Sequence, residues 1–143
     1  MMTVNEIQDQ VVEEFEMFDD WIARYDYLID LGRTVPPLDP KNKNNDYLIE
    51  GCQSKVWLFP SYDGKTITFS ADSDAIITRG IVALLIRVLS GRTPDEIINA
   101  DLWFIDRIGL KQNLSPTRSN GLLSMIKQMK LYAIAFKSKQ EQS

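Results

Sequence analysis

The 143-residue chain contains no histidine and one cysteine, Cys52. Without histidine it cannot form a Cys-His or Ser-His dyad, so it has no imidazole base for nucleophilic catalysis. One cysteine also excludes an ordinary structural zinc site, an iron–sulfur cluster held by this chain alone and an intramolecular disulfide. These absences argue against the usual catalytic side chains and fit a reducing compartment.

The chain also lacks a basic excess, a glycine-rich phosphate loop and a long apolar run. Its net charge is −4, which argues against nucleic-acid binding and gives no support to adhesion on an anionic membrane. The most hydrophobic stretch, residues 80–89, is too short to span a bilayer and includes Arg87. No basic segment precedes an apolar run at the N-terminus, so no signal peptide is predicted and cytoplasm is the expected location.

Two helices are predicted in the first part of the chain, at about residues 4–17 and 20–31. Thr3 and Glu6 have the spacing of a capping box, and Gly32 is expected to close the second helix as a left-handed C-cap. The apolar residues recur at steps of three and four, which predicts one buried helical face across both segments. These residues are Ile7, Val11, Phe15, Phe18, Ile22 and Tyr25.

The pattern then changes to short β-prone stretches at residues 47–49, 55–59 and 65–70, with a hairpin turn at 61–64. A buried central helix is expected at 75–89, followed by short helices at 94–100 and 101–108. A last helical region begins near Ser115, and the polar residues 137–143 are expected to form a frayed tail. This order predicts an α+β fold and a single domain over residues 1–143. The expected apolar stripe of the last region comprises Leu122, Met125, Ile126, Met129 and Ala133.

Cys52 follows a glycine at a point where an extended segment turns. Gly51 allows backbone conformations closed to other residues, so the thiol can stand at a loop tip. A free cysteine is more often a small buried hydrophobe than a nucleophile, and spacing alone favours that interpretation. If the thiol is reactive, thiol–sulfur exchange suits it best, because much of the activation can reside in the partner. A dithiol oxidoreductase fits poorly, because there is no resolving cysteine.

Five segments between residues 21 and 130 together resemble one known family. They are Gly51-Cys52-Gln53-Ser54-Lys55-Val56-Trp57-Leu58 and residues 24–38 (RYDYLIDLGRTVPPL), 71–80 (ADSDAIITRG), 91–97 (GRTPDEI) and 114–122 (LSPTRSNGL). In this order along the chain they are similar to the characteristic blocks of the SufE/CsdE family of cysteine-desulfurase sulfur acceptors.

The resemblance implies a fold similar to that of IscU-type cluster scaffolds, with Cys52 on a loop beside the sheet. It also implies that Cys52 accepts persulfide sulfur from a cysteine desulfurase, stimulates that enzyme and relays the sulfur to an iron–sulfur scaffold. The chain would then be an accessory protein and not itself an enzyme. Pyridoxal phosphate would belong to the desulfurase, so this chain is expected to bind no cofactor or metal, and to be a monomer or a weak homodimer.

Further matched positions have two interpretations each. Gly51 is expected to shape the loop. Gln53 is expected to shape it as well or, alternatively, to contact the persulfide. Arg118 could dock on the desulfurase or stabilise a sulfur anion, and the alternative is capping or a local ion pair at the start of the last helix. Asp72 and Asp74 are expected mainly as N-cap residues, with partner docking as the alternative. Trp57 and Trp103 are expected in the core.

The sequence departs from the family pattern at a few positions. Gln112 and Asn113 stand where a histidine is common, Arg79 where lysine is usual and Thr117 where serine is usual. The segment ahead of the cysteine loop also lacks an asparagine that members of the family commonly have there. These departures bear on the choice of partner, because none of them involves the thiol itself.

Two functions therefore remain after the sequence is read. The first is a sulfur relay through Cys52, and the alternative is an allosteric activator that docks on a desulfurase and does not need Cys52. For the relay, the resting thiol is expected to be partly sheltered in an apolar pocket, because a persulfide open to solvent would be lost to small thiols by exchange.

Overall fold

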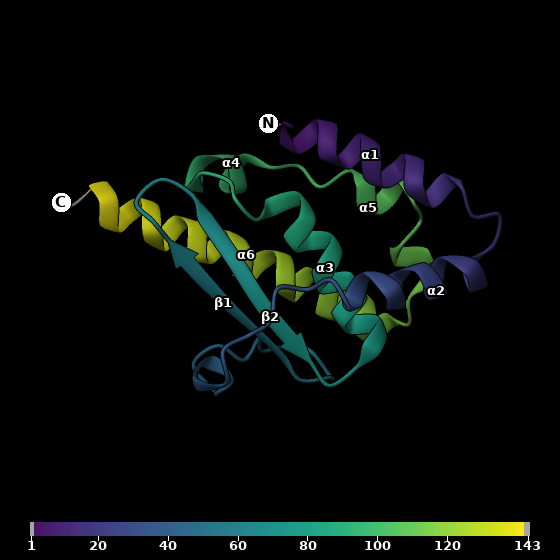
Figure 1. The fold of residues 1–143 in the computed structure, drawn as a ribbon, viewed down its shortest axis with the longest axis horizontal. Helices are drawn as coiled ribbons and strands as arrows, with labels where there is room; N and C mark the ends of the chain where they lie inside the picture. The colour runs from purple at the N-terminus through teal and green to yellow at the C-terminus, as the bar shows by residue number, and fades with distance from the viewer. Residues whose placement is uncertain (1, 142–143) are drawn as a thin grey trace.

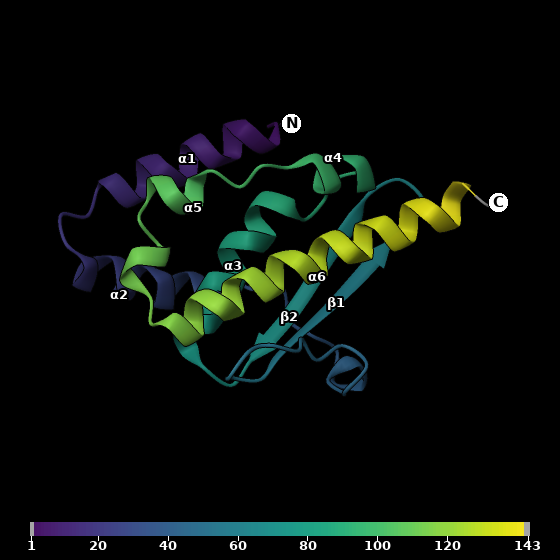
Figure 2. The same ribbon diagram turned by 180° about the vertical axis from the view of Figure 1, so that it is seen from behind.

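The computed structural model describes residues 2–141, and its α+β class confirms the prediction from the sequence. Figures 1 and 2 show a two-stranded hairpin with α3 and the long α6 on one side of it. In chain order the elements are α1 (Val4–Glu16), α2 (Trp21–Gly32), β1 (Val56–Tyr62), β2 (Ile67–Ser73), α3 (Ile76–Leu89), α4 (Pro94–Asn99), α5 (Phe104–Arg107) and α6 (Pro116–Glu141), with 3-10 turns at Pro40–Asn42 and Lys111–Asn113.

The hairpin pairs β1 antiparallel to β2, with Val56 opposite Ser73 at its open end. Burial alternates along both strands, so one face of the hairpin packs on the helices. The Asp63 carboxylate accepts backbone hydrogen bonds from the residues that follow it and so closes the turn. The β-prone segment before the cysteine contributes one isolated bridge, Leu48 to Trp57, and not a strand.

α3 is the central helix, and α2 crosses it at very short range. A Cβ built on Gly80 would lie 2.2 Å from the carbonyl oxygen of Leu28, and one on Gly32 would lie 3.1 Å from the Gly80 nitrogen. The expected left-handed C-cap at Gly32 is therefore wrong. Gly32 ends the helix in an ordinary conformation, Arg33 is the C-cap, and the glycine serves the close contact between the helices.

The single buried face predicted across α1 and α2 is interrupted at Ile22, whose side chain is 77% exposed. α1 ends at Glu16 and α2 restarts at Trp21 with Asp20 as its N-cap, so the helical phase is not continuous. α1 is instead held to α3 by Glu14, which accepts hydrogen bonds from both terminal nitrogens of Arg87, one of them at 2.6 Å. Tyr27 of α2 donates to the same carboxylate.

The later helices follow the sequence closely, with two differences. The capping box at Thr93 and Glu96 is confirmed, whereas α5 covers only Phe104–Arg107 of the helix predicted at 101–108. The frayed tail expected at 137–143 is wrong as far as Glu141, because α6 continues to that residue, and residues 142 and 143 lie outside the described range. Lys137 pairs with Asp95 at 2.7 Å and holds this end of the helix against α4.

The core consists of buried residues from the helices and the inner face of the hairpin. The predicted stripe of α6 belongs to it: Leu122, Met125, Met129 and Ala133 are buried and Ile126 is half-buried. Trp57 and Trp103, expected inside, are half-buried at the margin, where Trp57 lies under the Lys43 ammonium. Among residues 2–141 no helix has both the length and the apolar content needed to cross a membrane.

Candidate functional site

The loop that carries Cys52 rests on α6 through Gly51. Gly51 has a φ of +89°, in the left-handed region that favours glycine. A Cβ at this position would also lie 2.5 Å from Ser124 Oγ on α6. Gly51 therefore meets two requirements at once, the turn of the backbone and the close approach to the helix.

The Cys52 thiol is half-buried against the backbone of α6. It donates a hydrogen bond to the Gly121 carbonyl, with 3.6 Å between Sγ and the oxygen. Burial raises the pKa of the Cys52 thiol above its ordinary value, because the thiolate loses more hydration than the neutral thiol. At neutral pH the resting side chain is therefore a protonated thiol.

Cys52 opens onto a cavity of about 290 Å³ between its own loop, α3 and the start of α6. The expectation of an apolar pocket holds for Ile81 and Met125 but not for the rest of the lining. Five other lining side chains carry hydroxyl groups or a charge: Ser54, Thr78, Ser115, Thr117 and Arg118. The cavity can therefore hold a polarisable or anionic group beside the thiol.

Arg118 and Gln53 both line this cavity, as the loop sequence and the last matched segment suggest. Ser115 Oγ accepts a hydrogen bond from the Arg118 backbone N–H, so Ser115, not the arginine side chain, caps the start of α6. Throughout residues 2–141 no carboxylate forms an ion pair with Arg118. Its exposed guanidinium is therefore available to an anion at the cavity.

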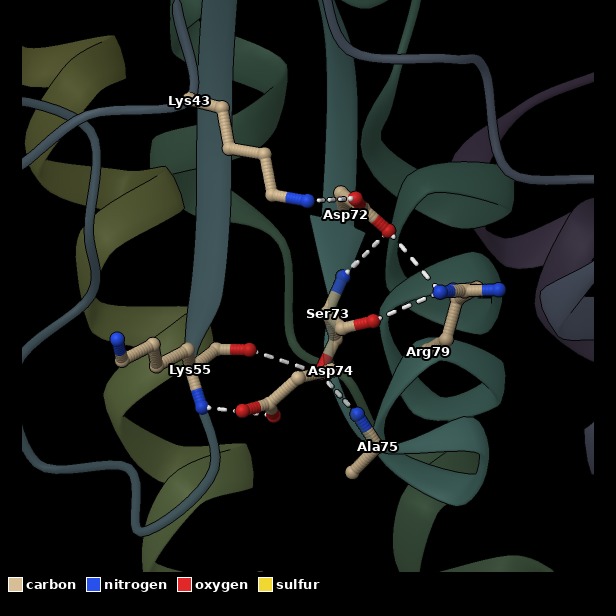
Figure 3. Close-up of polar contacts among 7 residues, drawn as sticks. All are labelled: Lys43, Lys55, Asp72, Ser73, Asp74, Ala75 and Arg79. Atoms are coloured by element: carbon tan, nitrogen blue, oxygen red, sulfur yellow. Dashed lines mark hydrogen bonds and ion pairs between the residues drawn. The ribbon is translucent and has the colours of Figure 1, made fainter. Parts of the chain in front are cut away.

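Asp72 lies outside the cavity, at the end of β2, and is neutralised within the chain. Figure 3 shows it between Lys43 Nζ, at 2.9 Å, and the Arg79 guanidinium, at 3.1 Å. Burial opposes ionisation of Asp72, but the hydrogen bonds from Lys43 and the Ser73 backbone, with the charges of Lys43 and Arg79, lower its pKa overall. Asp72 thus ties the segment before the cysteine loop to α3.

Asp74 fastens the other end of the cysteine loop (Figure 3). Its carboxylate accepts a hydrogen bond from the Lys55 backbone N–H at 3.0 Å, and its own N–H donates to the Lys55 carbonyl. The N-cap prediction for Asp72 and Asp74 is wrong, because Ala75 is the N-cap of α3 and has no side-chain cap. The extended backbone of Ala75 moves the start of the helix beyond the reach of both carboxylates.

Sequence reasoning missed most of the cavity lining. Gly121, Ser115 and Thr117 belong to the last matched segment, so the resemblance could have pointed to them. Thr78 lies within the matched segment 71–80 but stood out by no chemistry, and Met125 belongs to an apolar stripe that only indicates burial. In the part of the chain that the structure describes, no group of three or more acidic or cysteine side chains could hold a metal ion.

Comparison with known proteins identifies one family over most of the chain. Residues 9–133 match the family model described as "SufE: Fe-S metabolism associated domain". The chain is 40% identical over 127 residues to an uncharacterized SufE-like protein of Rhizobium etli, a match that spans 85% of this chain and 86% of the relative. It is 37% identical over 134 residues to SufE-like protein 1, chloroplastic/mitochondrial, of Arabidopsis thaliana, which spans 93% of this chain and 36% of the plant protein.

The fold also has a counterpart among solved structures. The solution structure of a hypothetical protein from Thermus thermophilus matches with a TM-score of 0.76 over 92% of this chain and 96% of that one. At 19% sequence identity this likeness shows a shared fold and nothing more.

Proposed function

Because this chain belongs to the SufE family, whose domain is associated with iron–sulfur metabolism, we propose that Cys52 accepts persulfide sulfur from a cysteine desulfurase. The protein stimulates that enzyme and relays the sulfur to an iron–sulfur cluster scaffold. The pyridoxal phosphate of the reaction belongs to the desulfurase. We expect the exchange in the cytoplasm, where a lone thiol stays reduced.

One observation carries this proposal: the chain's one cysteine opens on a cavity with room for added sulfur. The cavity measures about 290 Å³, several times the roughly 30 Å³ that a water molecule occupies in the liquid. A sulfur atom on Cys52 Sγ can therefore lie within the cavity, beside Ile81 and Met125. The hydroxyl groups and Arg118 around it can donate to the persulfide anion.

The transfer is a thiol–persulfide exchange without net oxidation. The Cys52 thiolate attacks the outer sulfur of the desulfurase persulfide, a new S–S bond forms at Sγ, and the bond to the desulfurase sulfur breaks. The desulfurase cysteine leaves as a thiolate and can accept the proton that Cys52 lost. The enzyme is then ready for another turnover, and Cys52 carries the persulfide.

In the proposed relay, docking changes the environment of Cys52. Its thiol is protonated, half-buried and bonded to the Gly121 carbonyl, so it is a poor nucleophile in the free protein. Gly51 and Asp74 define the two ends of the segment that would have to move. We assign Gly51 and Asp74 to positioning the loop, and Arg118 and Gln53 to contact with the persulfide or the partner.

Desulfurase turnover separates this proposal from an allosteric activator. We expect the wild-type protein to raise alanine production from cysteine, and Cys52→Ser to give no increase while still binding the enzyme. Gly64→Ala, far from the cavity at the hairpin turn, serves as a folded control. Equal stimulation by Cys52→Ser and wild type would contradict the relay and favour the docking activator.

A further inference from the structure

Thr78, on the first turn of α3, differs from the other polar side chains that line the cavity beside Cys52. It is only 6% exposed, whereas Thr117 and Arg118 reach solvent at the start of α6. Within residues 2–141 the Thr78 hydroxyl forms no hydrogen bond. A hydroxyl buried without a partner is unfavourable, so a ligand in this cavity would gain a hydrogen bond at no cost in lost hydration of the donor.

The start of α3 favours negative charge at the same place. Ala75 is the N-cap and has no side-chain cap, so the backbone N–H groups of residues 76–78 have no partner within the helix. Figures 1 and 2 both show the start of α6 close to the start of α3. None of the described residues that line the cavity carries a carboxylate. Two positive helix ends and an uncompensated arginine, Arg118, therefore act on a group bound there.

The resting contact of the thiol indicates where an added sulfur would lie. The Gly121 carbonyl accepts a hydrogen bond from the neutral Cys52 thiol at 3.6 Å. A persulfide has lost its proton at neutral pH and ends in a negatively charged sulfur, which a carbonyl oxygen repels. A methyl at Gly121 would lie 3.4 Å from Sγ, so α6 already occupies that side of the thiol. The added sulfur, about 2.05 Å from Sγ, therefore turns into the open cavity, which Thr78 lines from α3.

We propose that Thr78 holds the persulfide of the loaded protein: its hydroxyl donates a hydrogen bond to the terminal sulfur on Cys52. This inference rests on the proposed function, which supplies the persulfide. The bond is charge-assisted and forms away from bulk water, whereas exposed donors such as Arg118 remain hydrated. Thr78 thus stabilises the anionic persulfide over its protonated form. The cavity that keeps the resting thiol neutral holds the loaded sulfur as an anion.

The pH dependence of persulfide alkylation tests this bond without a desulfurase. Inorganic polysulfide loads Cys52 chemically: the thiolate attacks a polysulfide sulfur, an S–S bond forms at Sγ, and the shortened polysulfide leaves as an anion. After the excess is removed, iodoacetamide alkylates the protein, and intact mass separates the persulfide adduct from the thiol adduct. The midpoint of the persulfide rate against pH should lie about one pH unit higher in Thr78→Val than in wild type, an about tenfold smaller acid dissociation constant.

Two variants separate the hydroxyl from packing. Thr78→Ser keeps the hydroxyl, so its midpoint should match that of wild type. Thr68→Val makes the same chemical change as Thr78→Val at an exposed position on β2, and its midpoint should also match wild type. Equal midpoints in wild type and Thr78→Val would overturn the proposal. A midpoint raised equally in Thr78→Val and Thr78→Ser would overturn it as well, because packing would then be responsible.

Loading by a desulfurase is measured separately, so the two proposals fail in different ways. If the desulfurase loads wild type and Thr78→Val leaves the midpoint unchanged, the relay is supported and the role of Thr78 is wrong. If the desulfurase adds no sulfur to Cys52 but Thr78→Val raises the midpoint of the chemically loaded protein, the hydrogen bond is supported and the relay is wrong.

Discussion

Cys52 is protected by the same contacts that position it. Its Sγ lies against the α6 backbone and the cavity side chains, and this burial disfavours the thiolate that the proposed sulfur transfer requires. A partner that moves the loop would remove this obstacle where the persulfide donor is present. Under the proposed function, protection in the free protein and reactivity in the complex would both follow from movement of this segment.

The raised pKa of Cys52 has a direct kinetic consequence. Iodoacetamide should alkylate the folded protein more slowly than the unfolded chain at neutral pH, and the midpoint of the rate against pH should lie above the ordinary thiol value of about 8.5. The direction follows from burial, which stabilises the neutral form. A rate equal to that of a urea-denatured control would show that the thiol is not sheltered.

Gly51 offers a test of the loop's contact with α6. Gly51→Ala should destabilise the fold by about 2–4 kcal/mol, because the left-handed φ and the contact with Ser124 Oγ both oppose a methyl group. Gly64 has a similar φ of +94° but nothing within 4 Å, so Gly64→Ala should cost only about 1–2 kcal/mol. Urea denaturation measures both.

Removing the Ser124 hydroxyl isolates the steric part of that effect. The double variant Gly51→Ala with Ser124→Ala should recover most of the difference between the Gly51 and Gly64 variants, since the 2.5 Å contact is with Oγ. If Gly51→Ala and Gly64→Ala lose the same stability, the loop does not rest on α6 in solution.

At the scale of elements, the crossing of α2 and α3 depends on glycine. Alanine is the better helix former by about 1 kcal/mol, but a methyl at position 80 would lie 2.2 Å from the Leu28 carbonyl oxygen. The contact is with backbone atoms, which cannot move aside as the end of a flexible side chain can. Gly80→Ala should therefore lower the free energy of unfolding by about 3 kcal/mol or more. Gly32→Ala, with its nearest contact at 3.1 Å, should cost less. Equal stability of wild type and Gly80→Ala in urea would contradict this crossing.

The contact of α1 with α3 should give a pH-dependent stability. The hydrogen bonds from Arg87 lower the pKa of Glu14 despite its partial burial, and Tyr27 adds to the effect. A lowered folded pKa stabilises the fold above the ordinary glutamate value of about 4.3, and this stabilisation is lost as pH falls through the folded value. Glu14→Gln should therefore cost about 1–2 kcal/mol at pH 7 and less near pH 3.

A matched control exists for this pair on the surface of α2. Asp30 and Arg33 form an ion pair whose side chains are 66% and 73% exposed, so solvent screens it. Asp30→Asn should leave the free energy of unfolding close to that of wild type at both pH values. A Glu14→Gln effect that is the same at pH 7 and pH 3 would mean that the carboxylate charge does not hold α1.

At the scale of the whole molecule, periodicity and capping predicted most of the helices and the hairpin. Thr3, Thr93 and the apolar stripe of α6 are local patterns, and local patterns survive folding. The errors involve contacts between distant segments. Gly32 looked like a helix stop because the sequence does not show its close contact with Gly80 on a distant helix. The tail looked like a frayed end because its partners on α4 and β1 are also distant in the sequence.

The candidate site, too, was partly predictable from local sequence and partly dependent on contacts that only the fold reveals. Cys52, Gly51 and Gln53 were visible in one short segment, whose resemblance to a family carried more information than its spacing. Arg118 and Gly121 were visible as members of a distant matched segment, but their place beside the thiol required the fold. Asp72 and Asp74 looked like helix caps, since a sequence does not reveal that Lys43 and Lys55 are their partners.

Intact-mass spectrometry tests the central claim most directly. The protein is incubated with a pyridoxal-phosphate cysteine desulfurase and free cysteine, without reductant, beside Cys52→Ser. We predict that wild type gains the mass of one or more sulfur atoms, that dithiothreitol removes it, and that the variant gains none. An unchanged wild-type mass, with turnover of the desulfurase raised equally by both proteins, would contradict sulfur acceptance at Cys52.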